Sequence, residues 1–239
     1  MKALVYGAGV LGSYLAHVLV RASHDVTLLA RGKRYDELVQ HGLVIRHAAQ
    51  MKTTKDHVNL IQSLQPEDIY DIIFVVIQYT QLEGVLPILA ANQSKLIVLV
   101  GNNMAPRATK AAICGSNSDK IVLFAFQFTG GRRENGKIIS IHARAKMALG
   151  TLNGEDFAPQ RNLLQEAFTS AKYALNFRCD MEAYLLAHVA FVMPIAYACY
   201  ATNGNLKKED KALIQQIMSA TAEGYEVLKA NGIRVPHRR

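Results

Sequence analysis

A glycine pattern near the N-terminus is the part of this sequence whose residue types and spacing point most directly to chemistry. Residues 7–12 read Gly-Ala-Gly-Val-Leu-Gly, between the apolar run Lys2–Tyr6 and a helical pattern that begins at residue 10. In this strand–turn–helix context the first glycine permits a tight turn, the second lets a pyrophosphate approach the backbone, and the third allows close helix packing. The free N–H groups of the helix N-terminus favour phosphates. The pattern predicts a dinucleotide site rather than a simple turn, formed by Gly7, Gly9, Val10, Leu11 and Gly12.

The residues after the second predicted strand, Asp25–Ala30, indicate whether the dinucleotide is NAD or NADP. NAD sites commonly carry Asp or Glu there to bond the ribose 2′-hydroxyl. Here the chain continues as Arg31-Gly32-Lys33-Arg34, without an acid. A guanidinium can bind a 2′-phosphate through paired hydrogen bonds. Arg31 therefore predicts NADP as the cofactor, with Lys33 or Arg34 as helpers; the alternative is a basic surface loop.

The elements that must position these residues alternate short β-rich runs with helical patterns. The predicted strands are Lys2–Tyr6, Asp25–Ala30, Leu43–Arg46, Ile72–Ile77, Leu96–Val100 and Ile121–Phe126, and the predicted helices between them are Val10–Ala22, Leu82–Ala91 and Pro106–Cys114. This order is typical of an α/β fold with a Rossmann-type doubly wound parallel sheet. A turn at Arg132–Gly136 then precedes Lys137–Ser140 and Lys146–Leu149, which we expect to be short strands of a hairpin or meander.

From about residue 180 the pattern becomes helical, with one apolar helix to Ala201, a break at Asn203-Gly204 and a second helix over Glu209–Ala230. We therefore expect an NADP-binding domain over residues 1–178 and a small all-helical substrate and dimerisation domain over residues 179–239. The stretch Tyr184–Ala201 is apolar except for His188, and is as long as a short membrane span. Its internal proline and central histidine favour a buried helix or a homodimer interface over a span.

The composition fits a folded protein, because 50% of the 239 residues are hydrophobic and only 19% are charged. Three scattered cysteines (Cys114, Cys179 and Cys199) predict no disulfide framework. The first residues lack a signal-peptide pattern, so a cytoplasmic location is the default expectation. The net charge of +8 lies in short basic groups without interleaved aromatic residues, which makes nucleic-acid binding a minor alternative.

Several segments together resemble the ketopantoate reductase (2-dehydropantoate 2-reductase) family. They are GAGVLGSYLA, VTLLARGKR, HGLVI, DIIFVVIQYTQLEGVLPIL, LIVLVGNNM and MPIAYACYATNGNL, and the match is looser after about residue 155. The resemblance implies reduction of a 2-oxo acid, such as 2-dehydropantoate, to a 2-hydroxy acid with NADPH. It places Gln78 in the family's "K-x-Y-Q" segment and Asn102 beside the nicotinamide.

The sequence departs from the family at the positions that carry its chemistry. Gln78 replaces a lysine, Asn103 replaces a glycine, and Leu185 stands where the family's catalytic lysine is expected. The family's terminal helices are also missing, which fits either a piece of a longer chain or a short relative. His188, one helical turn from Leu185, is the candidate proton donor, and Glu182 and Tyr184 are further polar candidates. The alternative is a catalytically degenerate protein that binds NADP(H) in a sensing or structural role.

Other residues are assigned no catalytic chemistry. His41, His47, His57 and His142 lack the spacing of metal ligands, so no metal site is predicted. Ser13, which follows the glycine pattern, is expected to contact phosphate rather than to act as a nucleophile. The cysteines are expected to be free thiols.

Overall fold

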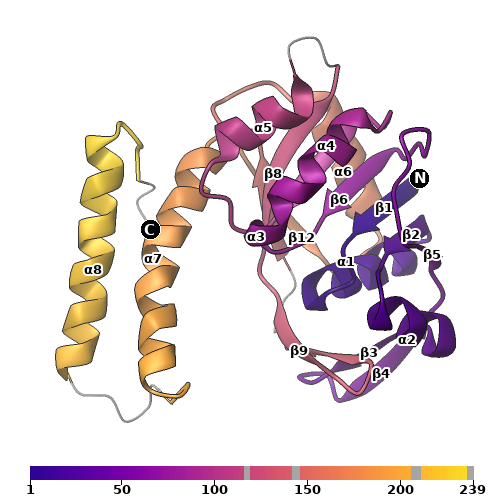
Figure 1. Cartoon of the computed structure of the whole chain (residues 1–239), viewed down its shortest axis with the longest axis horizontal. Coiled ribbons are helices and arrows are strands. Elements are labelled where there is room, and N and C mark those ends of the chain that lie inside the picture. The colour runs from indigo at the N-terminus through magenta and orange to yellow at the C-terminus, as the bar shows by residue number, and fades with distance from the viewer. Residues whose placement is uncertain (116–118, 142–145, 206–210, 236–239) are drawn as a thin grey trace.

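A computed structural model describes residues 1–115, 119–141, 146–205 and 211–235 (Figure 1). Its main sheet has eight strands, in the order β12 (Ala174–Arg178), β11 (Lys146–Gly150), β8 (Ile121–Gln127), β7 (Leu96–Val100), β6 (Ile72–Val75), β1 (Lys2–Tyr6), β2 (Asp25–Leu29) and β5 (Asn59–Ile61). The run from β5 to β8 is parallel, while β11 and β12 run in the opposite direction. Read from β1 outward on both sides, this is the strand order of a Rossmann sheet. The predicted fold class is confirmed.

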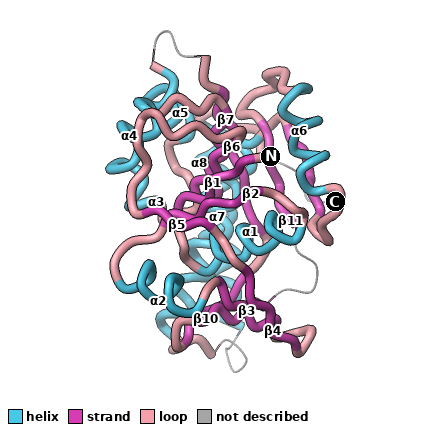
Figure 2. Tube along the Cα trace, turned by 90° about the vertical axis from the view of Figure 1, so that its right-hand side faces the viewer, coloured by secondary structure: helices cyan, strands magenta, loops and turns pink. Residues whose placement is uncertain are grey.

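Helices cover both faces of this sheet (Figures 1 and 2). They are α1 (Val10–Arg21), α2 (Lys33–His41), α3 (Tyr79–Leu82), the 3₁₀ turn η1 (Glu83–Val85), α4 (Leu86–Ala91), α5 (Pro106–Cys114), α6 (Ala158–Phe168), α7 (Met181–Ala201) and α8 (Lys211–Ala230). The core on one face includes side chains of α1 and α6, and the core on the other includes side chains of α3, α4, α5 and the start of α7. Because both faces are covered, β7 (Leu-Ile-Val-Leu-Val) is buried along its whole length.

A second sheet of four strands lies beside α1. Its order is β4 (Lys52–Asp56), β3 (Leu43–His47), β10 (Lys137–Ile141) and β9 (Gly130–Glu134). Asp56 at the end of β4 connects it to α1, because its carboxylate lies 2.5 Å from His17 Nδ1 and 2.7 Å from Arg21 Nη2.

This second sheet corrects two expectations. The strand predicted at Leu43–Arg46 exists, but the third strand of the parallel run is β5. The predicted pairing of Lys137–Ser140 with Lys146–Leu149 is wrong, because β10 pairs with β9 and β3, whereas β11 pairs with β8 and β12. Strand patterns indicate an extended chain and a buried face, but they do not determine the partner strand. Helices α2 and α6 and strands β4, β5, β9 and β12 were not expected, and β9 covers the first part of the turn expected at Arg132–Gly136. The helix expected at Leu82–Ala91 begins at Tyr79 and is interrupted by η1.

Helices α7 and α8 lie side by side and extend away from the sheet (Figure 1). Only the start of α7 packs on the core, where Met181 and Leu185 are fully buried. Further along, Gly224 allows a close approach, because a Cβ atom there would lie 3.0 Å from the Cβ of Ala190. The break at Asn203 and Gly204 has positive φ angles of 50° and 80°, which end helix α7.

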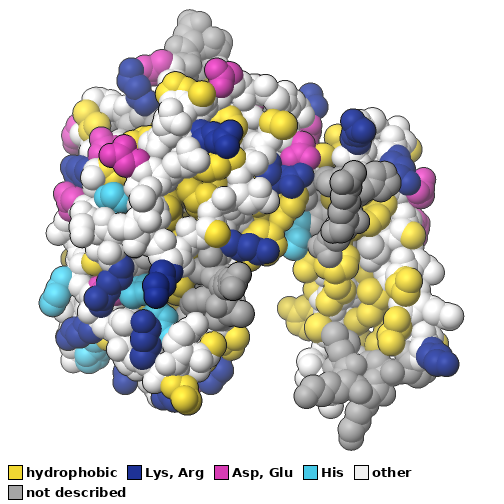
Figure 3. All heavy atoms as spheres, turned by 180° about the vertical axis from the view of Figure 1, so that it is seen from behind, with side chains coloured by type: hydrophobic (Ala, Val, Ile, Leu, Met, Phe, Trp, Pro, Cys, Tyr) yellow, Lys and Arg dark blue, Asp and Glu magenta, His cyan; other side chains and the backbone are white. Residues whose placement is uncertain are grey.

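The apolar helix α7 is not buried within its own chain, contrary to the simplest expectation from its sequence. It is long and apolar enough to cross a membrane by length and composition, which for a single helix is weak support for a span, and only 11% of its most apolar stretch is buried. Hydrophobic side chains gather over helices α7 and α8, beside the open gap between these helices and the rest of the molecule (Figure 3). The exposed ones are Met193, Tyr197, Tyr200, Ile214, Met218 and Val227.

Candidate active site

The carboxyl ends of the parallel strands lie together at one edge of the main sheet, and four predicted site residues follow those ends. Gly7 follows β1, and Arg31 comes two residues after β2; Gln78, which is exposed, follows β6, and Asn102 follows β7. Open α/β sheets bind ligands outside this edge, where the strand order reverses. In this sheet the reversal falls between β1 and β6. The structure therefore brings together residues that lie almost 100 positions apart in the sequence.

The glycine loop, Gly7–Gly12, has the geometry that a pyrophosphate cradle requires. Gly7 has a φ of +119°, and a Cβ atom there would lie 2.4 Å from the carbonyl oxygen of Val76. A Cβ on Gly12 would lie 1.9 Å from the carbonyl oxygen of Gly7, so the glycine lets α1 pack directly on the loop. Gly9 differs from both, since it is exposed and no atom lies within 4 Å of its Cβ position. The loop is therefore closed toward the sheet and open where a ligand would approach, and it fits a dinucleotide.

The basic residues after β2 differ in accessibility. Arg31 and Lys33 are exposed, and neither forms an ion pair within the parts of the chain that the structure describes. Burial raises the pKa of Tyr6 at the end of β1, and the positive charge of Arg31 opposes that rise. Arg31 is thus a free cation beside the end of β1, as a 2′-phosphate site would need.

Arg34 does not lie where the sequence predicted. Its side chain is buried, and the guanidinium donates from Nε to the Ala8 carbonyl oxygen (3.2 Å), from Nη2 to Ser13 Oγ (3.3 Å) and from Nη1 to the Gly136 carbonyl oxygen (2.7 Å). Ser13 is fully buried and its hydroxyl donates to the same Ala8 oxygen at 3.2 Å. Arg34 and the buried Leu38 share the inner face of α2 one turn apart. Of the two helpers predicted for Arg31, only Lys33 is therefore accessible, and the burial of Ser13 does not favour the phosphate contact expected of its hydroxyl.

The two asparagines after β7 have different roles. Asn102 is exposed and lines a small pocket between the ends of β6 and β7, together with Ile77 and Tyr79. Asn103 is buried, where its Nδ2 donates to Thr109 Oγ1 at 3.1 Å and its Oδ1 accepts the N–H of residue 105 at 2.9 Å. Asn103 therefore holds the start of α5, and Asn102 is the exposed one of the two asparagines at this edge.

Sequence reasoning missed Gln127, a polar residue at the end of the apolar strand β8. Its side chain is buried at the same edge, and its Nε2 lies 3.4 Å from the Leu11 carbonyl oxygen and 2.7 Å from Thr129 Oγ1. Its Oε1 is buried and has no hydrogen-bond partner within the described residues. The signal available in the sequence was a lone amide after six residues without polar side chains.

The first turns of α7 supply the candidate proton donor. Leu185, which the resemblance places where the family's lysine is expected, is fully buried in the core. His188 is half-buried, and its ring centroid lies 4.1 Å from that of Phe126, near the carboxyl end of β8. The structure thus brings His188 toward the edge that carries the glycine loop. Its catalytic role stays a prediction.

The other polar candidates on α7 are engaged elsewhere. Glu182 is 6% exposed and forms paired hydrogen bonds with Arg107 of α5, at 2.5 and 2.7 Å. The Arg107 guanidinium lowers the pKa of Glu182, so this carboxylate is ionised at neutral pH and is a poor proton donor. Tyr184 packs its ring under the guanidinium of Arg178, 4.6 Å away.

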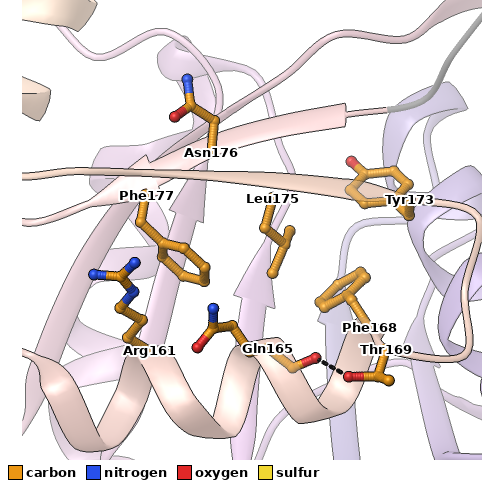
Figure 4. Close-up of a pocket in the computed structure, with 8 residues that line it drawn as sticks. All are labelled: Arg161, Gln165, Phe168, Thr169, Tyr173, Leu175, Asn176 and Phe177. Carbon is orange, nitrogen blue, oxygen red and sulfur yellow. Dashed lines mark hydrogen bonds between the residues drawn. The ribbon is translucent and has the colours of Figure 1, made fainter.

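A separate hollow lies between α6 and the edge strand β12 (Figure 4). Its lining residues include Arg161, whose guanidinium lies 5.1 Å from the ring of Phe177. None of the predicted site residues lines it. Among the described residues no group of three His, Cys, Asp or Glu side chains could hold a metal ion, while His142 lies outside them. The three cysteines are free.

Comparisons with known proteins agree with this fold. The sequence profile of the family described as ketopantoate reductase PanE/ApbA matches residues 3–154. A PanE/ApbA family ketopantoate reductase from Ralstonia eutropha JMP134 is similar in structure, with a TM-score of 0.80, 17% identity, and coverage of 99% of this chain and 77% of that chain. For 2-dehydropantoate 2-reductase from Methylococcus capsulatus the values are 0.72, 20%, 99% and 76%. For D-mandelate dehydrogenase, solved with NADH and anilino(oxo)acetate, they are 0.82, 15%, 98% and 76%. No curated protein sequence matches the chain.

The fold identifies the structural class of this protein, and the sequence profile identifies its family. The sheet order and the glycine loop are those of a Rossmann-type α/β protein followed by helices. Because the profile covers well over half of the chain, the chain belongs to the ketopantoate reductase PanE/ApbA family. The resemblance drawn from the sequence is thereby confirmed.

Proposed function

We propose that this protein binds NADP(H) at the carboxyl edge of its main sheet and reduces a 2-oxo acid, such as 2-dehydropantoate, to the 2-hydroxy acid. One observation carries the cofactor assignment: Arg31, which is exposed and forms no ion pair with any described residue, follows β2 at the same edge as the loop whose Gly9 has open space at its Cβ position. The D-mandelate dehydrogenase structure contains NADH, so the charge of Arg31 is our reason for assigning the phosphorylated form here.

Each part of the site has a role in this proposal. The glycine loop binds the pyrophosphate, Arg31 with Lys33 binds the 2′-phosphate, and Gln78 and Asn102 border the nicotinamide end. When bound, the reduced cofactor supplies a hydride for the ketone carbon. His188 gives a proton to the ketone oxygen, a task that suits a histidine near neutral pH.

A second candidate function rests on Leu185. A fully buried leucine replaces the family's lysine, and it offers neither charge nor proton to a ketone. The alternative is therefore a protein that binds NADP(H) for sensing or structure without turnover. Titration with NADPH, followed by NADPH oxidation with a panel of 2-oxo acids, separates the two. Turnover supports the reductase, binding without turnover supports the alternative, and no binding contradicts both.

Replacing His188 tests the proton donor directly. We expect His188→Ala to lower turnover by roughly 100-fold, the lower end for loss of a general acid, while the NADPH dissociation constant stays unchanged. The measurement is steady-state NADPH oxidation together with fluorescence titration. His57→Ala, at an exposed histidine outside the site, is the matched control. Unchanged turnover in His188→Ala would remove this residue from the mechanism.

We also propose that residues 1–178 form the cofactor domain and residues 179–239 the helical substrate and dimerisation domain, in a cytoplasmic protein. The change from β12 to α7 at residues 178–181 supports the boundary. The apolar surface of the helical pair supports a homodimer, because water contact with so many large side chains is unfavourable.

Sedimentation tests the homodimer. We expect a dimer at micromolar concentration for the wild type and a monomer for the double variant Ile214→Asp and Met218→Asp, which places charges on the exposed surface of α8. Met51→Asp is the control, because this side chain is 90% exposed and lies between β3 and β4, which are separate from α7 and α8 in Figure 1. A wild-type monomer would contradict the proposal.

A further inference from the structure

Arg34 joins three segments that are distant in sequence. Its guanidinium contacts the glycine loop at Ala8, the first turn of α1 at Ser13, and the turn between β9 and β10 at Gly136. Glu37 lies 3.3 Å from Nη1 and balances part of the charge. Burial lowers the pKa of Arg34, and Glu37 opposes this effect. Burying a guanidinium costs desolvation energy unless its N–H donors are hydrogen-bonded. Because the hydrogen bonds to the loop, the helix and the turn satisfy these donors, they favour one arrangement of the three segments.

The contact with Ala8 controls where the next N–H points. The carbonyl oxygen of Ala8 accepts hydrogen bonds from Arg34 Nε and from Ser13 Oγ, both at 3.2 Å. In a trans peptide the C=O and the following N–H point in opposite directions. Holding the Ala8 oxygen toward the protein interior therefore turns the N–H of Gly9 away from the interior, at a residue that is exposed and whose Cβ position has no atom within 4 Å.

From this geometry we propose that Arg34 is a positioning residue that sets the glycine loop for the pyrophosphate, by fixing the Ala8–Gly9 peptide against the β9–β10 turn. The inference rests on the proposed cofactor function and divides the basic cluster by role. Arg31 distinguishes the two nucleotides through the 2′-phosphate. Arg34 serves the pyrophosphate, which NADPH and NADH share, and so affects both equally.

Nucleotide titration with both cofactors tests this division. We expect Arg34→Ala to weaken NADPH and NADH by the same factor, roughly tenfold or more, with an unchanged ratio of the two dissociation constants. Ser13→Ala, which removes one of the two donors to the Ala8 oxygen, should weaken both by a smaller equal factor. A changed ratio would mean that Arg34 binds the 2′-phosphate, and unchanged affinities in a folded variant would mean that it positions nothing; either result overturns the inference.

Hydrogen exchange in the nucleotide-free protein provides a readout that does not depend on binding. We expect Arg34→Ala to increase exchange both in residues 7–13 and in the β9–β10 turn near Gly136, while the distant α5 stays protected. Arg34→Lys should show the same pattern although it keeps the charge, because an ammonium cannot replace the planar fork of donors. Unchanged exchange in either segment would refute the proposed role of Arg34 as a positioning residue. If the wild type bound neither nucleotide, the cofactor proposal would fail, and exchange would still decide whether Arg34 couples the two segments.

Discussion

Gly9→Ala is expected to abolish most nucleotide binding while leaving the fold intact. The Cβ atom would enter the open side of the loop, where no protein atom lies within 4 Å, and Gly9 has a φ of −70° that alanine adopts without strain. The methyl group would occupy space that the pyrophosphate needs. We expect roughly a tenfold or greater loss of NADPH affinity, measured by fluorescence titration, with an unchanged melting temperature.

Gly12→Ala is the matched control, and for this variant we expect a loss of folding stability. Its Cβ would lie 1.9 Å from the carbonyl oxygen of Gly7, so α1 must move away from β1. Such overpacking should cost about 3 kcal/mol in the free energy of unfolding, visible in urea denaturation. Equal stability losses in Gly9→Ala and Gly12→Ala would show that the loop glycines serve the fold alone.

Arg31→Ala is expected to remove the preference for NADPH over NADH. A guanidinium that binds a phosphate through charged hydrogen bonds contributes about 1.5–3 kcal/mol, which corresponds to a loss of about 10- to 100-fold for NADPH. NADH lacks the 2′-phosphate, so its affinity should change little. The ratio of the two dissociation constants, from parallel titrations, is the decisive quantity.

Lys33→Ala is the control for Arg31, because both side chains are exposed in the same basic segment. We expect a smaller loss, since an ammonium contributes a point charge without a paired geometry. A wild type that binds both nucleotides equally, or an Arg31→Ala variant that keeps its preference, would contradict the assignment of NADP.

The sequence alone predicted several elements of the parallel sheet together with their boundaries. The strands Lys2–Tyr6 and Leu96–Val100 and the helix Pro106–Cys114 have the boundaries expected from their patterns. Local signals sufficed because the parallel strands are buried on both faces, which produces uninterrupted apolar runs. The glycine spacing was informative within the loop, because the close contact that Gly12 permits is with the nearby Gly7, whereas the close contact at Gly7 is with the distant Val76.

Only the tertiary structure decided which polar residues are available to a ligand. Arg31 and Arg34 are three positions apart and chemically identical, yet one is exposed and the other is buried beneath the glycine loop. The difference comes from Ala8, Ser13 and Gly136, whose oxygen atoms surround Arg34 only after the chain has folded. Likewise, the apolar pattern of α7 predicted a buried helix or a homodimer interface, and the choice between them depends on what packs against the helix. Composition and spacing report what a residue can do, and long-range packing determines what it contacts.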